Sequence, residues 1–147
     1  MKFFTHFIVF ICCLLMVSSF LTSCEKKKQE AKLIIAEQEF SLNKDTERTF
    51  IIDCKGKIQN VGDVDVKKVV VTGFCRSCGE EMIPGRWFTS SIQKTTTQKD
   101  VINFIGAGDE MEFNFTEVAN FMLTNGQKAP ELPDKLEVVI QSYEIVE

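Results

Sequence analysis

Histidine is almost absent from this chain of 147 residues, and the only one, His6, lies in an N-terminal segment that we expect to be removed. Without histidine, a mature protein has no Ser–His or Cys–His nucleophilic pair, no histidine base and no histidine ligand for zinc. A hydrolase would need two carboxylates facing each other across a cleft, and no pattern in the sequence indicates one. We therefore predict no catalytic residues, no metal site and no cofactor.

An excess of basic charge is lacking as well. The chain has 17 lysines and arginines against 21 acidic residues, a formal net charge of −4. Loss of residues 1–23 would remove Lys2 and no acidic residue, leaving 17 − 1 = 16 basic side chains against 21. Binding of nucleic acid needs a basic face, so we exclude nucleic acid as a partner.

Long apolar runs are missing except near the N-terminus, where residues 7–21 are almost wholly apolar. A run of about 15 residues is shorter than the roughly 20 that a membrane-spanning helix needs, and it is typical of a signal-peptide core. It ends in Leu21-Thr22-Ser23-Cys24, which resembles the lipobox of bacterial lipoproteins. The small residues before Cys24 give a signal peptidase access, and the thiol of Cys24 can accept diacylglycerol.

The resemblance implies a signal peptide over residues 1–23, a lipidated Cys24 with a polar tether over 24–31, and a domain over 32–147. Two or three acyl chains, at about 0.8 kcal/mol per buried methylene, would hold the protein on a membrane in an extracytoplasmic space of the cell envelope. Glu25 is not the aspartate associated with inner-membrane retention, so we favour the outer membrane where two membranes exist. An ordinary secretory signal and a short anchor helix are the alternatives.

From Lys32 onward, apolar residues alternate with polar ones, which predicts strands. Residues 50–59 show this most clearly, because Phe50, Ile52 and Cys54 share one face. We predict strands over residues 33–42, 50–59, 66–75, 87–92, 101–105, 111–115 and 136–141, and one short helix over 116–123. The fold class is mainly β: a single antiparallel, immunoglobulin-like β-sandwich with at most one short helix, a small barrel being the alternative.

A stretch across the second and third predicted strands resembles FxLYD-type and related immunoglobulin-like domains of bacterial surface proteins. Those domains carry a G-x-v-x-N-x-G-x-x-x-l-x-x-V-x-V pattern. The matching positions here are Gly56, Ile58, Asn60, Gly62, Val66, Val69 and Val71, and Gly108 and Phe113 match a later strand entry. Residues 73–77 stand where the F-x-L-Y-D segment of that family would fall. The resemblance implies a binding or spacer module that carries no catalytic residues.

Three cysteines remain in the expected mature domain: Cys54, Cys75 and Cys78. A structural disulfide from Cys54 to Cys75 or Cys78 is the favoured interpretation, since a ring of about 22 residues is worth about 3 kcal/mol. A redox-active Cys75-x-x-Cys78 is a second interpretation, although the acidic residues that follow it would raise a thiol pKa. Soft-metal binding by the three thiolates is a third, and free thiols or an intermolecular bridge are also open.

A turn at Pro84-Gly85 is followed by Arg86, Trp87 and Phe88. Such residues dominate protein interfaces, so they are a candidate interaction surface; the favoured alternative is that the only tryptophan fills the core. The sequence thus predicts a membrane-anchored module without enzymatic activity that binds a protein partner through strand edges or loops. A thiol–disulfide or metal-handling protein of the envelope that uses Cys75 and Cys78 is the alternative function.

Overall fold

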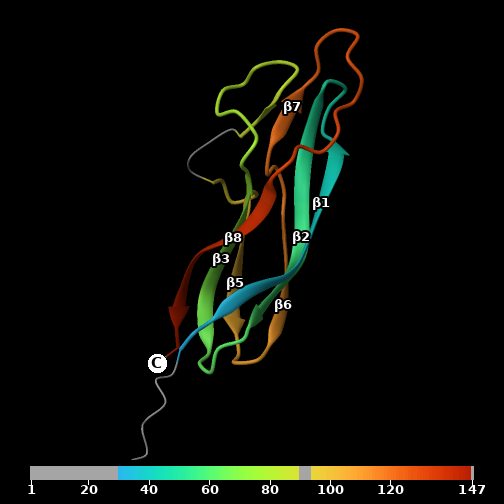
Figure 1. The fold of residues 1–147 in the computed structure, drawn as a ribbon. Helices are drawn as coiled ribbons and strands as arrows, with labels where there is room; N and C mark the ends of the chain where they lie inside the picture. Colours follow the sequence, from blue (N-terminus) through green and yellow to red (C-terminus); the bar gives the residue numbers. More distant parts are fainter. Residues whose placement is uncertain (1–29, 90–93, 147) are drawn as a thin grey trace, which may run out of the picture.

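A computed structural model describes residues 30–89 and 94–146 of the chain. Within these residues the protein is all β, with eight strands in two packed antiparallel sheets and no helix (Figure 1). The strands are β1 (Leu33–Lys44), β2 (Thr49–Asn60), β3 (Val66–Cys75), β4 (Trp87–Phe88), β5 (Lys99–Ile105), β6 (Glu110–Phe115), β7 (Asn120–Met122) and β8 (Leu136–Ile145). The predicted signal segment and Cys24 lie outside the described residues, and no described helix has the length and apolar character of a membrane span.

The larger sheet has five strands and is organised by β2, which pairs with β1 along one edge. The other edge of β2 is divided between two partners. Residues 54–59 pair with β6, and residues 49–51 pair with β7, which in turn pairs with β4. The smaller sheet has the order β5-β3-β8. An antiparallel two-layer fold is therefore confirmed.

The core lies between the inward faces of the two sheets. Ile52 and Ile58 of β2 face Val69 and Val71 of β3, and all four side chains have 0% exposure. Burial of an aliphatic side chain of this size contributes about 1.5–3 kcal/mol, so this alternating pattern accounts for the association of the sheets.

The open sides of the sandwich are blocked by polar side chains. On one side, Gln38 Oε1 of β1 accepts a hydrogen bond from Val138 N of β8 at 3.1 Å. On the other, Asp100 Oδ2 of β5 accepts one from Asn114 N of β6 at 3.0 Å. Each occupies a backbone donor that could otherwise pair with a strand of another molecule.

The described chain has two distinct poles. Glu30 N donates to Asp63 Oδ1 at 2.6 Å and Val146 N donates to Asp65 O at 3.0 Å, so both described ends meet at one end of the sandwich, the terminal pole (Figure 1). From Asn60 at this pole, β2 runs about 33 Å to Phe50, at about 3.3 Å per residue. The loops over residues 76–86 and 123–135 lie at the opposite end, the loop pole.

Six of the seven predicted strands are confirmed as β1, β2, β3, β5, β6 and β8. The predicted strand over residues 87–92 is short, because β4 covers Trp87–Phe88, and residues 90–93 lie outside the described chain. The predicted helix over residues 116–123 is wrong. Val118 N donates to Ile52 O at 2.8 Å and Ile52 N donates to Ala119 O at 3.1 Å, so this segment continues the larger sheet beside β2, beyond the end of β6.

Candidate functional site

A cleft of about 520 Å³ opens at the loop pole. Its apolar lining includes Trp87 of β4 and Phe121 of β7, whose rings meet edge to face with centroids 5.2 Å apart. Residues 77–86 form one wall, and Pro133 contributes to the opposite wall. A cleft of this size, with aromatic side chains inside and polar groups at the rim, has the dimensions of a small-ligand or side-chain site.

A disulfide between Cys75 and Cys78 braces this cleft. The two residues are three apart in sequence, their Cα atoms are 5.4 Å apart, and Cys78 N also donates to Cys75 O at 3.4 Å. The bridge fixes a tight turn at the end of β3, where Cys75 is buried and Cys78 is partly buried. Because this turn contains Ser77 and leads directly into residues 79–86, the disulfide sets the position at which the first wall of the cleft begins.

The turn between the two cysteines also holds the opposite wall. Arg76 N donates to Lys135 O at 3.0 Å, and Ser77 Oγ donates to Asp134 O. The guanidinium of Arg76 also forms an ion pair with Glu137 at 2.5 Å. These contacts connect the segment next to Pro133 to the turn, so both walls are tied to one small covalent ring.

The predicted disulfide from Cys54 is wrong. Cys54 is a free thiol, 3% exposed, and its burial raises its pKa to about 12. The alternation of the sequence correctly placed Cys54 and Cys75 on inward faces, but alternation does not fix the height of a residue along its strand. Cys54 lies in the middle of β2 opposite Phe40 and Phe115, whereas Cys75 ends β3 beside Leu136.

The three predicted interaction residues divide between the cleft and the core. Arg86 is exposed and Trp87 is partly buried, and both line the cleft, whereas Phe88 is 8% exposed and belongs to the core. Trp87 also packs against the core, and its Nε1 donates to Glu131 O at 3.0 Å. The indole is therefore fixed in place between the core and the cleft, so neither of the two interpretations of Trp87 describes it completely.

The charged side chains that line the cleft have no ion-pair partners within the described chain. Glu80 and Glu81 line the cleft, and neither carboxylate forms an ion pair within the described chain. Arg86, which also lines the cleft, has no ion pair there either. The rim therefore carries two carboxylates and one guanidinium that are free to interact with a ligand.

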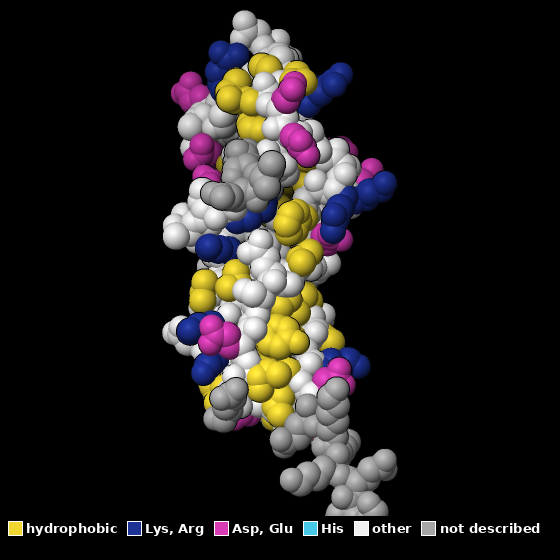
Figure 2. All heavy atoms as spheres, turned by 90° about the vertical axis from the view of Figure 1, so that its left-hand side faces the viewer, with side chains coloured by type: hydrophobic (Ala, Val, Ile, Leu, Met, Phe, Trp, Pro, Cys, Tyr) yellow, Lys and Arg dark blue, Asp and Glu magenta, His cyan; other side chains and the backbone are white. Residues whose placement is uncertain are grey.

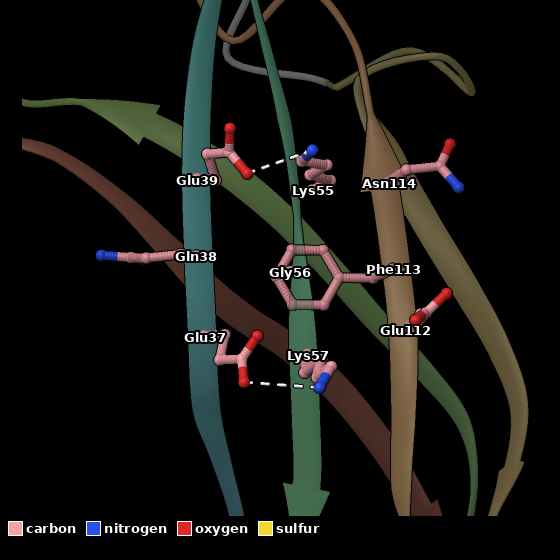
Figure 3. Close-up of a pocket in the computed structure, with 9 residues that line it drawn as sticks. All are labelled: Glu37, Gln38, Glu39, Lys55, Gly56, Lys57, Glu112, Phe113 and Asn114. Carbon is pink, nitrogen blue, oxygen red and sulfur yellow. Dashed lines mark hydrogen bonds and ion pairs between the residues drawn. The ribbon is translucent and has the colours of Figure 1, made fainter.

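A second cleft, of about 530 Å³, lies over β1, β2 and β6 of the larger sheet (Figure 3). Its cations are already paired. Lys55 contacts Glu39 at 3.1 Å, and Lys57 lies 3.3 Å from Glu110 and 3.4 Å from Glu37. Hydrogen bonds to Glu110 and Glu37 raise the pKa of Lys57. We interpret these residues as a solvated cross-strand ladder that supports the sheet.

At the inward-facing positions of the same strands, the ring of the buried Phe113 covers Gly56 on the neighbouring strand (Figure 3). A Cβ atom at Gly56 would lie 2.6 Å from Phe113 Cζ and 2.1 Å from Glu37 O. Glycine is therefore required at this position by the close approach of β1 and by the aromatic ring.

Chemically, the cleft at the loop pole offers apolar contact and charged groups at its rim. The described residues contain no group of three histidine, cysteine or acidic side chains placed to hold a metal ion. The sequence identified the cysteine pair and Arg86-Trp87 separately, but gave no indication that they adjoin. Phe121 and Pro133 were missed, because they reach the cleft from β7 and from the loop before β8.

The fold and this site define an all-β protein of two packed antiparallel sheets with a disulfide-braced cleft at one pole. Comparison of the chain with protein-family models, with curated proteins and with solved structures gives no match.

Proposed function

We propose that this protein is a lipid-anchored binding module of a bacterial cell envelope, and that it binds another protein in the cleft at the loop pole. The observation that carries the proposal is the placement of that cleft. Glu30 enters the fold at the terminal pole, and the cleft lies at the far end of β2. A tether running from a lipidated Cys24 to Glu30 would present the cleft away from the membrane surface.

The finer fold assignment belongs to the same proposal. An immunoglobulin-like sandwich of the FxLYD type is supported by the two packed sheets and by the role of Asn60 in its turn. The side chain of Asn60 donates to Val64 O at 2.8 Å and accepts from Gly62 N at 3.1 Å, which gives the N-x-G pattern a structural purpose. The module has no assigned catalytic residue.

A second candidate function is thiol–disulfide exchange in the envelope, and the Cys75–Cys78 bond is the observation that favours it. Two features weigh against it. Cys75 is only 7% exposed, and acidic Glu80 and Glu81 follow Cys78, so the setting does not stabilise a thiolate. A structural brace accounts for the bond more simply.

Site-specific crosslinking tests the binding function. A photoreactive amino acid in place of Ile83, which lines the cleft, should capture one protein in the native membrane. Placed at Val101, which is 48% exposed on the smaller sheet, it should not capture that protein. A second substitution, Trp87→Ala, should abolish capture from position 83. Equal capture from both positions, or none from position 83, would contradict the proposal.

The anchor needs its own test. Mass spectrometry of the protein from its native membrane should show a new amino terminus at Cys24 with diacylglycerol on its sulfur. Cys24→Ser should release the protein from the membrane fraction. An intact Met1, or an unmodified thiol on Cys24, would end the anchor proposal without affecting the assignment of the cleft.

A further inference from the structure

The apolar part of the cleft extends onto its rim. Ile83 lines the cleft and is 42% exposed, and the neighbouring Met82 is 61% exposed. Leu132, next to Pro133 on the opposite wall, is 42% exposed. Large apolar side chains therefore stand open to solvent on both walls, above the aromatic pair of Trp87 and Phe121. Figure 2 shows hydrophobic side chains at this pole with acidic and basic side chains beside them.

Acidic groups accompany these apolar residues on the first wall. Glu80 and Glu81 line it, and neither forms an ion pair within the described chain. The segment of the second wall carries charges of both signs, Glu131 and Asp134 with Lys128 and Lys135, and none of these four forms an ion pair there. Arg86 is the one cation that lines the cleft. The cleft thus combines an apolar interior with a rim on which carboxylates outnumber cations.

From this combination, and resting on the proposed binding function, we infer that the cleft takes an extended peptide segment of a partner protein in which an apolar side chain is flanked by lysine or arginine. The apolar side chain contacts Trp87 and Phe121, and the flanking cations meet Glu80 and Glu81. The volume of about 520 Å³ has room for a few side chains of such a segment and not for a folded domain. Electrostatic complementarity of this kind selects among partners more than it adds affinity.

The smaller sheet offers a contrast. Its outer face exposes Val101 and Phe104, by 48% and 50%. There the neighbouring cation Lys68 is already paired with Glu144 at 2.9 Å. Glu144 on that face is therefore already neutralised, unlike Glu80 and Glu81 at the cleft.

Fluorescence of Trp87 provides a direct assay, because it is the only tryptophan of the chain and it lines the cleft. The full mature protein in a zwitterionic detergent is titrated with three short acetylated peptides. Their central residues are lysine–leucine–lysine, glutamate–leucine–glutamate and lysine–serine–lysine, each flanked by glycine. We expect the first peptide to bind about tenfold more tightly than either of the others.

Charge-neutralising variants test the contribution of the acidic residues at the rim. Glu80→Gln combined with Glu81→Gln should weaken binding of the lysine–leucine–lysine peptide about fivefold, a size typical of exposed ion pairs. Glu112→Gln, the same change in the second cleft, should have no effect. Raising the salt concentration from about 50 mM to about 1 M should remove most of the preference for lysine over glutamate, because the screening length falls to about 3 Å.

Each negative result would contradict a different part of the proposal. Equal binding of the lysine- and glutamate-flanked peptides would overturn the charge preference, and equal binding of the serine peptide would overturn the apolar one. If no peptide changes Trp87 fluorescence while crosslinking from position 83 still captures a protein, the inferred segment is wrong and the binding module stands. If crosslinking fails as well, the proposed function falls with it.

Discussion

Reduction of the Cys75–Cys78 bond should destabilise the fold by about 2 kcal/mol, because closing a loop this short removes little entropy from the unfolded chain. The two cysteines are three apart in sequence, so the ring is among the smallest that a disulfide can close. The same entropy model gives about 3 kcal/mol for the ring of about 22 residues that a bridge from Cys54 would close. Reduction removes no heavy atom, so it isolates the bond better than substitution of the buried Cys75 does.

The assay is urea unfolding of the oxidised and the reduced protein, followed by fluorescence of Trp87, with a phosphine as reductant. The expected loss shifts the unfolding midpoint by about 1 M at a typical slope of about 2 kcal/mol per M. The Cys54→Ala variant serves as control, because Cys54 takes no part in the bond and the oxidised–reduced difference should persist.

Connectivity is checked independently by a tryptic digest without reductant. Trypsin cleaves after Arg76, inside the ring, so residues 69–76 and 77–86 should be recovered as one disulfide-linked pair. Residues 49–55, which contain Cys54, should be recovered alone. A digest in which residues 49–55 are linked to either of the other peptides would refute the assignment. An unchanged unfolding midpoint on reduction would refute the claim that the bond braces the fold.

Three further changes test other parts of the structure. Gly56→Ala should lower the free energy of unfolding by about 3 kcal/mol or more, since its Cβ would lie 2.1 Å from Glu37 O. Gly79→Ala, whose Cβ meets nothing closer than 3.8 Å, should lower it by under about 1 kcal/mol in the same urea assay. Similar losses for the two variants would contradict the close approach at Gly56. Asn60→Ala should lower the free energy of unfolding by about 3 kcal/mol, because it leaves Val64 O and Gly62 N without their partner inside the fold. A loss of less than about 1 kcal/mol in thermal unfolding would refute the role of that side chain. Cys54 should resist iodoacetamide at pH 8 until the protein unfolds, and rapid alkylation of the folded protein would contradict its burial. Because the pKa of Cys54 in the folded protein, about 12, exceeds the usual 9.0, the contribution of this thiol to stability should be complete below pH 9 and decline between pH 9 and 12.

The sequence was informative wherever one face of a strand is buried. In β2, the alternation of Ile52, Cys54 and Ile58 with polar neighbours predicted both the strand and its inward face, and burial of those three side chains agrees. In β3, the boundaries Val66–Cys75 were predicted to the residue, since the Asn60–Gly62 turn and the cysteine-rich turn delimit it. Local pattern determines such elements because their side chains alternate with the pleat.

Pattern failed where the outcome depends on distant partners. Residues 116–123 look helical in isolation, yet Val118 and Ala119 bond to Ile52 because β6 leaves that part of β2 without a partner. The disulfide was misassigned for a related reason, since inward-facing cysteines on two strands need not lie at the same height. The sequence named Arg86 and Trp87 but not the cleft that they line, because Trp87 and Phe121 meet only through the pairing of β4 with β7.

The two poles show why the disulfide and the cleft occur together. At the terminal pole, short turns are fixed by buried polar contacts, such as those of Asn60 with Val64 and Ile105. The loop pole has two long loops whose apolar residues Met82, Ile83 and Leu132 are open to solvent, and segments with few buried contacts are the first to open in a fold. Under the proposed function these side chains stay exposed for a partner, so their burial cannot stabilise the loops. The Cys75–Cys78 ring and the Trp87–Glu131 hydrogen bond fix both loops without covering the cleft, so the brace and the exposed apolar rim are two parts of the binding site that we propose.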